Sequence, residues 1–327
     1  MRVLVLCLLV LGACSRSETV ETEPTKTEVE PTAPGTGNSD EAAMDETASM
    51  LEAPPSLALL EAGKPPREEL RHEWREGSKH TLRVRSEWTV DAVVFPIQAK
   101  MVMPDLDYEL EALVKAVAED GTAQFELRVA NVTVKPSKEV DPQTLEQIEE
   151  AAGSMTGAKG RFSIDPRGLV RALEILDIPP TASMRFYEMI DQIGQALRLA
   201  SLPLPGEPVG RGARWTATQV IEYRGARIQQ RSTYELLRIK GGRLRTRIAL
   251  EQTAPKQRLK PKGRSGALVL NEVTFEGDGE GTWQLGGLAP RSASEETKTL
   301  LHIVRHTPPK QLVLATTTLT MRVREGR

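Results

Sequence analysis

The sequence of 327 residues is poor in residue types on which several classes of protein depend. Its two cysteines are too few for a disulfide framework or for a zinc site built from cysteine ligands. Its 43 basic and 45 acidic residues nearly balance, so the whole chain has no net charge that would attract nucleic acid. The length suits one or two domains.

The N-terminus has only a short hydrophobic run. Residues 3–11 are apolar, whereas a helix that crosses a bilayer needs about 20 such residues. Arg2 before this short core, and Gly12 and Ala13 after it, are typical of a secretory signal. We therefore expect residues 1–13 to be a signal peptide and the protein to be exported.

The end of this segment resembles a known family. The residues Leu-Gly-Ala-Cys at 11–14 are similar to the lipobox of bacterial lipoproteins. The resemblance covers residues 1–15 and implies that the peptide is cut before Cys14, whose sulfur carries a diacylglyceryl group and whose amine is acylated. Several acyl chains give stable anchoring, which a single chain does not. Ser15, where an aspartate would indicate retention in the inner membrane, favours the outer membrane. The alternative is an ordinary secretory signal with a chance cysteine.

Residues 14–66 have the composition of a disordered acidic tether. They are rich in Glu, Thr, Pro, Ser, Gly and Ala, and residues 14–65 carry 11 acidic against three basic side chains, a net charge of −8. Such a segment has too few large apolar side chains to offset the entropy lost on ordering. We expect it to hold the domain clear of the bilayer. A short helix at 56–62 and recruitment of a partner by the acidic run are the alternatives.

Residues 67–327 are predicted to form one β-rich domain. Apolar and polar residues alternate with period two, for example at Leu82, Val84 and Trp88, which is typical of strands with one buried face. The pattern predicts hairpins at 108–117 with 124–134 and at 161–164 with 169–173, and a meander of strands at 214–223, 227–239 and 243–253.

Two helices interrupt the strands. Asp141 and Pro142 predict the start of one helix and Gly153 its end. Residues 183–200 predict a longer helix with one apolar stripe, which we expect to pack on the sheet. The predicted fold class is α+β and β-rich, with a large twisted antiparallel sheet that forms a meander or half-barrel. In the style of its strands and helices it looks like the half-barrels of periplasmic lipoprotein carriers.

The two halves of the domain, residues 67–200 and 206–327, share a weak similarity. Tyr-Glu-Leu at 108–110 and at 234–236 is followed by a turn and a second strand in both halves. A strand led by a glycine and carrying a tryptophan comes before each of them. Generic hairpins give such matches by chance, so duplication and coincidence remain two hypotheses.

One strand carries the candidate ligand site. Gly277, Gly279 and Gly281 alternate with acidic residues and are flanked by the aromatic residues Phe275 and Trp283. Glycines on the buried face of a strand indicate the close approach of another element, a bend or a ligand. We interpret the five residues as a candidate groove for a lipid or an acyl chain. A crossing helix or a bend is the alternative.

Charge is distributed unevenly along the domain. Residues 66–205 have a net charge of −6, and residues 206–327 have a net charge of +11. Arg243, Arg245 and Arg247 share one face of a strand. The candidate anion-binding residues are Lys256, Arg258, Lys260, Lys262 and Arg264. Anionic head groups, lipopolysaccharide and peptidoglycan are the partners that such a patch suggests, and a solvated face is the alternative.

Signals for catalysis and metal binding are weak. His302 and His306 have the spacing of two metal ligands on a helix, but on a strand they would lie about 13 Å apart, so we expect no metal site. Residues 263–266, Gly-Arg-Ser-Gly, depart from the nucleophile elbow of hydrolases. We therefore expect no enzyme, no cofactor and no nucleic-acid partner.

We interpret the chain as a lipid-anchored envelope protein, most simply a binding module with an apolar groove for a lipid or acyl ligand. The alternative is a structural protein that contacts anionic envelope polymers through its basic patch. A hydrolase is the third hypothesis.

Replacement of Cys14 by serine tests the anchor. We expect the C14S variant to carry no label from radioactive palmitate and to leave the detergent phase in phase partitioning, because the lipobox thiol that receives the lipid is absent. A labelled variant that stays in the detergent phase would contradict the lipobox assignment.

Overall fold

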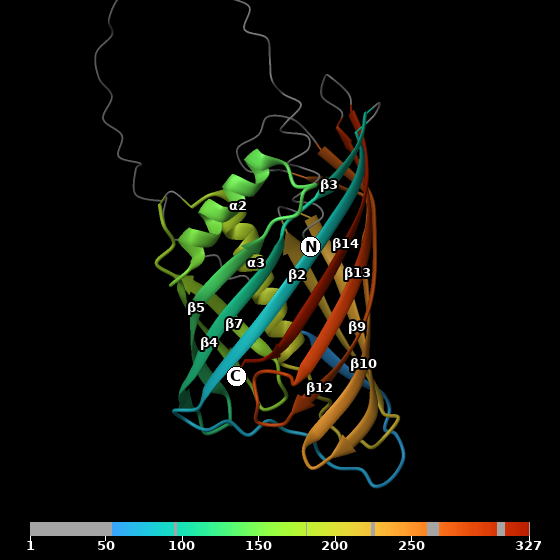
Figure 1. Ribbon diagram of the computed structural model, residues 1–327. Helices are drawn as coiled ribbons and strands as arrows, with labels where there is room; N and C mark the ends of the chain where they lie inside the picture. The colour runs from blue at the N-terminus through green and yellow to red at the C-terminus, as the bar shows by residue number, and fades with distance from the viewer. Residues whose placement is uncertain are drawn as a thin grey trace, which may run out of the picture.

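The computed structural model describes residues 54–94, 97–180, 182–223, 226–259, 268–305 and 311–326. Its strands form one large antiparallel sheet of 14 strands, and two helices accompany it, so the β-rich α+β fold class is confirmed. The strands run obliquely along the molecule, and the sheet is strongly curved (Figure 1).

Two meanders make up the sheet. The first contains β2 (Lys79–Val94), β3 (Ile97–Val102), β4 (Asp105–Val117), β5 (Ala123–Lys135), β6 (Lys159–Ile164) and β7 (Val170–Leu176). The second contains β8 (Arg214–Tyr223), β9 (Ala226–Lys240), β10 (Arg243–Ala254), β11 (Gln257–Leu259), β12 (Leu268–Gln284), β13 (Ser292–Arg305) and β14 (Gln311–Glu325).

The meanders join through the last strand. With β1 (Ser56–Glu61) at one edge, the strand order is β1-β8-β9-β10-β12-β13-β14-β2-β4-β5-β6-β7, with β3 beside β2 and β11 beside β12. β14 pairs with β2 along its length, from Val313 opposite Val94 to Glu325 opposite Leu82. We call the end of the sheet with the β9–β10 turn the lower end, and the opposite end, with β3 and β11, the upper end, as they stand in Figure 1.

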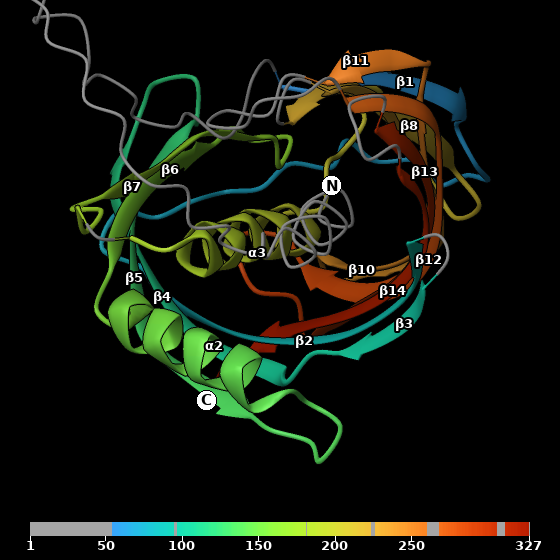
Figure 2. The ribbon, with the colours of Figure 1, turned by 90° about the horizontal axis from the view of Figure 1, so that it is seen from above.

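The longer helix, α3 (Met184–Ala200), lies inside the curve of the sheet. Ser183 caps it by accepting a hydrogen bond from the Phe186 N–H. Ile190, Ile193 and Leu197 are buried, so the predicted apolar stripe packs on the strands. Figure 2, a view from above, shows the sheet curving around α3. The shorter helix, α2 (Pro142–Met155), packs on β5 and on α3.

α2 begins where the sequence predicts and ends later. Asp141 caps its first turn. The helix then continues through Gly153 to Met155, and the left-handed conformation is adopted by Gly157, at φ 89°. The prediction that Gly153 ends the helix is therefore wrong. The buried side chain of Met155 holds one further turn against the core.

The folded part of the chain begins earlier than predicted. Strand β1 (Ser56–Glu61) pairs with β8, from Ser56 opposite Thr218 to Glu61 opposite Arg214. Its Leu57 and Leu59 pack against the core. Residues 56–61 are thus neither a disordered tether nor a short helix. Their alternate leucines give them an apolar face that suits the edge of a sheet.

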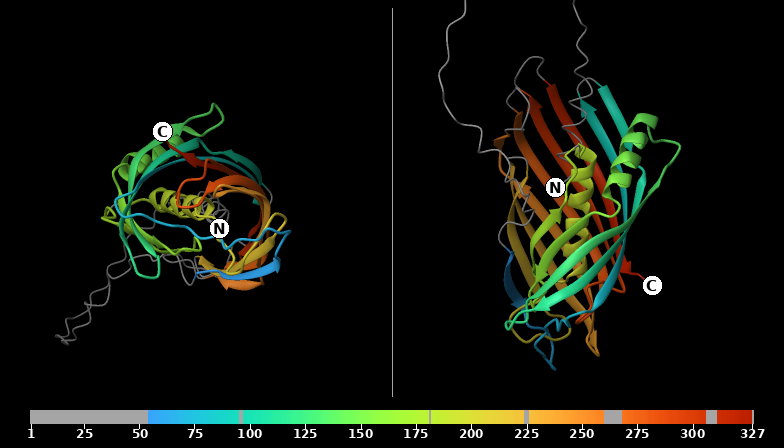
Figure 3. Two further views of the ribbon diagram at one scale, coloured as in Figure 1. Left: turned by 90° about the horizontal axis from the view of Figure 1, so that it is seen from below. Right: turned by 90° about the vertical axis from the view of Figure 1, so that its left-hand side faces the viewer.

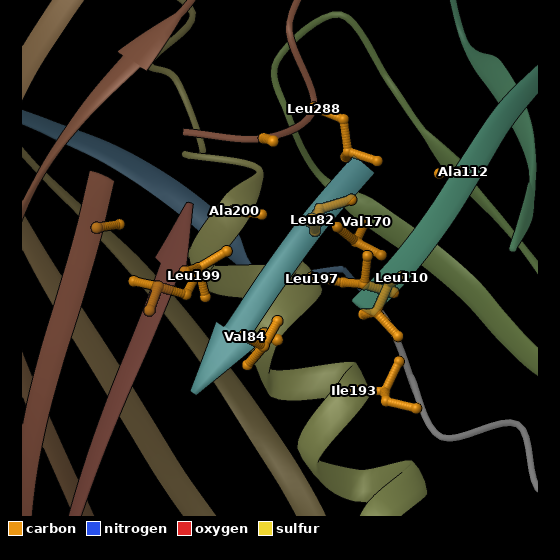
Figure 4. Packing of buried hydrophobic residues seen from close by; sticks show 14 of the residues in the cluster. Leu82, Val84, Leu110, Ala112, Val170, Ile193, Leu197, Leu199, Ala200 and Leu288 are labelled. Atoms are coloured by element: carbon orange, nitrogen blue, oxygen red, sulfur yellow. The ribbon is translucent and has the colours of Figure 1, made fainter. Parts of the chain in front are cut away.

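The core fills the space between α3 and the strands around it. Figure 4 shows Leu197 of α3 close to Leu82 of β2 and Leu110 of β4, and all three side chains are fully buried. Trp215 and Trp283 close the core toward the lower end. Their indole N–H groups donate to the carbonyl oxygens of Pro203, at 2.8 Å, and of Leu199, at 3.3 Å, so the two rings are buried with their polar atoms satisfied.

The segment between β1 and β2, residues 62–78, crosses the lower end of the molecule (Figure 3, left). Glu68 pairs with Val209, and the His72 N–H donates to the Pro166 carbonyl at 2.7 Å. The His72 side chain is only 3% exposed, and its ring stacks on Trp74 with ring centroids 5.0 Å apart. This segment covers the core where the strands start and end.

The structure gives the two halves one matching detail and one mismatch. The N–H of Gly77 donates to the Val114 carbonyl, and the N–H of Gly212 donates in the same way to the Leu236 carbonyl. The tyrosines that the sequence similarity aligns stand six residues before the first acceptor, at Tyr108, and two residues before the second, at position 234. No single alignment of the two halves therefore matches both the tyrosines and the hydrogen-bonded carbonyl groups. Duplication stays a hypothesis.

The unfolding free energy should fall in mild acid because of His72. Burial lowers the pKa of His72 to about 4, and the Leu202 carbonyl and the charge of Asp165 offset only part of this effect. Since the unfolded chain binds the proton near the usual pKa of 6.5, the stabilisation is complete above that pH and is lost as the pH falls toward about 4. We expect a loss of about 2 kcal/mol between pH 7 and pH 5 from this residue.

Urea unfolding at both pH values measures this loss, with His72→Phe as the comparison because a phenyl ring preserves the stacking on Trp74. The variant should lose less stability than the wild type by about 2 kcal/mol. His80, whose pKa burial also lowers, titrates in both proteins and cancels in the comparison. Equal losses in the two proteins would contradict the assignment.

Candidate functional site

The two faces of the sheet differ in chemistry. In β10 every second residue from Leu244 to Ala254 is buried, and the residues between them are exposed. The convex face carries ion pairs between neighbouring strands, such as Arg247 with Glu235 at 3.0 Å. Large apolar side chains gather on the concave face, so a ligand with an apolar chain has its partners there.

All five candidate groove residues lie on the concave face of β12. Phe275, Gly281 and Trp283 are buried, and Gly277 and Gly279 are half-buried. The acidic residues that alternate with them are exposed or half-exposed on the convex face. The structure therefore brings the five residues to one side of a single strand, facing the interior of the curve.

Contacts within the sheet account for the three glycines. A Cβ atom on Gly277 would lie 2.7 Å from the Cγ2 atom of Thr297, and one on Gly279 would run into the carbonyl oxygen of Ser294 on β13. At Gly281 the indole ring of Trp283 occupies the space. Close approach of another element, one of the meanings of such glycines, is therefore what the structure shows, and that element is the next strand and a tryptophan ring.

Gly279 also belongs to a row of residues that crosses the concave face. The strand registers place on this row Tyr234, Ile248, Gly279, Glu295, Met321 and Ser86. α3 contacts β13 and β14, and its Arg198 lies near enough to Glu295 for the two charges to interact. Sequence reasoning singled out neither of these two residues.

The electrostatics of this row follow from its position inside the curve. Burial raises the pKa of Glu295 to about 7, and the charge of Arg198 offsets only part of the rise. Burial likewise lowers the pKa of Arg198, against the charges of Asp191 and Glu295. A polar group placed against this row would meet one cation and one carboxyl group that is about half protonated at neutral pH.

A pocket of about 350 Å³, its opening to solvent included, lies where β3 ends and β4 begins. Met103 and Pro104 separate β3 from β4 there. The Met103 N–H donates a long hydrogen bond, 3.4 Å, to the Trp88 carbonyl. We call it the helix pocket, because α2 and α3 supply one of its walls. Its lining consists of Trp88, Met103, Pro104, Leu106, Ile148, Arg185, Glu188, Met189 and Gln192.

Three polar side chains of α3 stand in the otherwise apolar helix pocket. Arg185 and Glu188 form an ion pair of 2.9 Å, and their side chains are only 13% and 9% exposed. Gln192 accepts a hydrogen bond of 2.6 Å from the Tyr108 hydroxyl. Ligand pockets typically combine apolar walls with a few such fixed polar groups, which orient the ligand.

The basic residues predicted to bind anions are only partly within the described residues. Lys256 and Arg258 are exposed beside and in β11 at the upper end. Lys260, Lys262 and Arg264 lie outside the described residues. The arginines of β10 are exposed on the convex face, but Arg245 and Arg247 are paired with Glu280 and Glu235, so that face carries little excess charge at this point.

Other candidate site residues from the sequence also lie outside the described residues. Cys14 precedes the first described residue, and so does the whole signal segment. His302 lies on β13, while His306 is not among the described residues. Within the described ranges, no group of three or more histidine, cysteine, aspartate or glutamate side chains could hold a metal ion. The helices described there are too short or too polar to span a bilayer.

No protein-family model matches the chain, and no curated protein sequence matches it significantly.

Sequence reasoning missed the helix pocket. Glu188 and Gln192 stand on the polar side of α3, away from the apolar stripe, and this position favours exposure to solvent. In the structure both residues are buried, because the sheet surrounds the helix instead of covering one side. A signal was present in Met103-Pro104, since proline interrupts the pairing of a strand within a sheet.

Alanine substitutions at two glycines separate close packing from helix propensity. Gly279→Ala should lower the unfolding free energy by about 2 kcal/mol, because the new methyl group meets the backbone of β13. Gly153→Ala should raise it by about 0.5–1 kcal/mol, because Gly153 lies inside α2 with no atom near the new methyl group.

Urea unfolding followed by circular dichroism measures both changes. A neutral Gly279→Ala would show that β12 and β13 tolerate a side chain at this point, and the glycine track would then need a different explanation.

Proposed function

We propose that the chain is a lipid-anchored protein of the cell envelope whose folded part binds one end of an acyl chain or of a similar amphiphile at the helix pocket, without catalysing a reaction. The observation that carries the proposal is the pocket itself. Its walls are apolar, and its polar groups, Arg185, Glu188 and Gln192, all come from one helix.

The composition of the pocket favours an amphiphile over a fully polar ligand. Trp88, Met103, Leu106, Ile148 and Met189 would cover an apolar chain. Methionine adapts its shape readily, so a pocket with two of them accepts chains that differ in length or branching. Breaking the buried ion pair between Arg185 and Glu188 would be costly, because it would leave one charge buried without a partner. We therefore expect the ligand to form a hydrogen bond to the pair while the pair stays intact.

The residues of the pocket also support binding over catalysis. Its lining contains no serine, cysteine or histidine. The groups that most often act as nucleophile and general base are therefore missing from this site. Glu188 is already engaged in the ion pair with Arg185, at 2.9 Å.

The anchor and the address rest on the N-terminal residues alone. The lipobox at 11–14 supports attachment of Cys14 to a membrane, and Ser15 supports the outer membrane. A domain held at a membrane by acyl chains would find acyl-bearing molecules at high local concentration, which makes a moderate affinity sufficient.

The structural alternative, contact with anionic envelope polymers through the stretch 256–264, gains little from the described residues. Lys256 and Arg258 are exposed, but Arg245 and Arg247 of β10 form ion pairs with glutamates on the neighbouring strands.

Filling the helix pocket tests the proposal. Met103→Trp places a bulky indole ring in the pocket at a half-buried position. We expect it to weaken binding of the fluorescent acyl probe cis-parinaric acid by about tenfold or more. The matched control is Leu285→Trp, a half-buried leucine just after β12 at the lower end, which should leave the affinity unchanged.

Trp88 provides a second readout for the same experiment. A brominated fatty acid bound in the pocket should quench part of the tryptophan fluorescence, and Trp88→Phe should remove that part while the probe still binds. If the wild type binds no probe, or if Met103→Trp binds it as well as the wild type does, the helix pocket is not an acyl-chain site.

A further inference from the structure

The convex face of the sheet changes character toward the upper end. The strand registers align one row across six neighbouring strands, which we call the upper belt: Val220, Gln229, Thr253, Thr274, Leu300 and Thr316. All six side chains are uncharged, and all are exposed except Thr316, which is half-exposed. The row continues onto β2 and β3 with Asp91 and Lys100.

Below the upper belt the same face is highly charged. Every ion pair between strands formed by the described residues lies on the lower side of this row, from Arg322 with Glu87 to Arg214 with Glu61. Two residues below the belt, four of its strands carry the charged residues Arg231, Glu251, Glu276 and Lys298. A two-residue step along these strands therefore takes the surface from charged residues to glutamine, threonine and leucine. Sequence alternation alone, with polar residues facing solvent, does not require this change.

Exposed apolar side chains gather at the same level. Val220 is 46% and Leu300 49% exposed, and Leu314, one step further up on β14, is 39% exposed. Leu300 and Leu314 are diagonal neighbours, because Leu300 pairs with Thr316. Of the large apolar side chains of the described residues that are exposed, only Leu60 of β1 and Tyr187 of α3 lie elsewhere.

Near the belt, on β3, β9 and β11, the exposed charges of the described residues are mostly positive, whereas α2 on the other side of the molecule presents the exposed acids Glu146, Glu149 and Glu150. Lys100, Arg227, Lys256 and Arg258 are exposed there, and none of them forms an ion pair with another described residue. Asp91, the register partner of Lys100, is an exposed acid at this level. Among the described residues, the belt side of the upper end thus combines an uncharged, partly apolar surface with four cations that form no ion pair.

The path of the chain agrees with an upper end that faces the membrane. β1 runs downward from Ser56, opposite Thr218, so its first residue is the one nearest the upper end. The 41 residues between Cys14 and Ser56 would span on the order of 35 Å as a flexible coil. A tether of that reach allows the upper end to meet the bilayer but does not force it to, so the surface itself has to favour the contact.

We propose that the upper end of the sheet docks on an anionic bilayer surface, with Leu300, Leu314 and Val220 entering the headgroup region and the four basic side chains contacting lipid phosphates. Apolar side chains ringed by cations suit a lipid interface, where both kinds of group gain. A sugar or peptidoglycan polymer would match the cations but would leave the leucines without a partner. This docking goes beyond ligand binding in the helix pocket and does not depend on it.

Vesicle binding of the full chain tests the docking. The chain carries Cys14→Ser in every sample, so that lipidation cannot attach it to the membrane. We expect it to co-sediment with vesicles of phosphatidylglycerol and phosphatidylcholine, and much less with vesicles of phosphatidylcholine alone. The double variant Lys256→Glu with Arg258→Glu should reduce the partition coefficient by about tenfold or more.

Matched substitutions at the lower end serve as controls. Lys240 and Arg243 flank the β9–β10 turn and are exposed, so Lys240→Glu with Arg243→Glu changes the net charge by the same amount at the opposite end. Leu300→Ser with Leu314→Ser should also weaken binding, whereas Leu60→Ser, at a leucine that is 53% exposed, should not. Thermal unfolding of each variant shows that the fold is intact.

Three outcomes would overturn the proposal. The first is no binding to the anionic vesicles. The second is equal loss from the upper-end and lower-end charge variants, which would indicate attraction without orientation. The third is a concentration-dependent dimer that Leu300→Ser with Leu314→Ser abolishes while vesicle binding is unchanged, which would make the upper belt an interface between copies of the chain. Met103→Trp should leave vesicle binding intact, so failure of the pocket and failure of the docking are separate results.

Discussion

The pairing of β14 with β2 is the interaction on which the rest of the structure depends. It joins the last strand of the chain to the first long one, from Val313 opposite Val94 to Glu325 opposite Leu82. Without it the chain would form two separate meanders, each with two open edges and one apolar face that α3 alone could not cover. With it, one continuous sheet curves around the helix, and the loss of loop entropy on closing so long a chain is offset by a shared core.

Because the sheet encloses α3, polar residues of this helix are buried as well as its apolar stripe. A helix that lies on a flat sheet buries one stripe and leaves the other side to water. Inside the curve, Glu188 and Gln192 are buried, and they persist there because Arg185 and Tyr108 supply partners. Charged groups are tolerated in an interior only when they are paired and hydrogen-bonded. The same enclosure sets the environment of Glu295, whose pKa burial raises to about 7.

Local patterns predicted the elements well, and long-range geometry explains what they missed. Alternation located β2 and β10 with their correct faces, and Ser183 marked the start of α3. The end of α2 was misplaced because tertiary packing of Met155 outweighed the local preference of Gly153. β1 was missed because a short leucine pattern in an acidic, proline-rich context has no strand partner nearby, and its partner β8 follows more than 150 residues later. The helix pocket needs three elements from distant parts of the chain, so no local pattern could show it.

The arrangement of surfaces gives a physical reason for the pocket and the upper belt to occur together. Below the belt the convex face carries ion pairs between strands. An acyl chain that left a bilayer and crossed this face would have to desolvate these charged side chains, which is costly. The N-terminal turn of α3, which carries Arg185 of the pocket, points toward the upper end. A molecule resting on that end would present the helix pocket from the membrane side, past a surface without charge pairs. The orientation of the domain and the route of its ligand would then be set by the same row of uncharged residues.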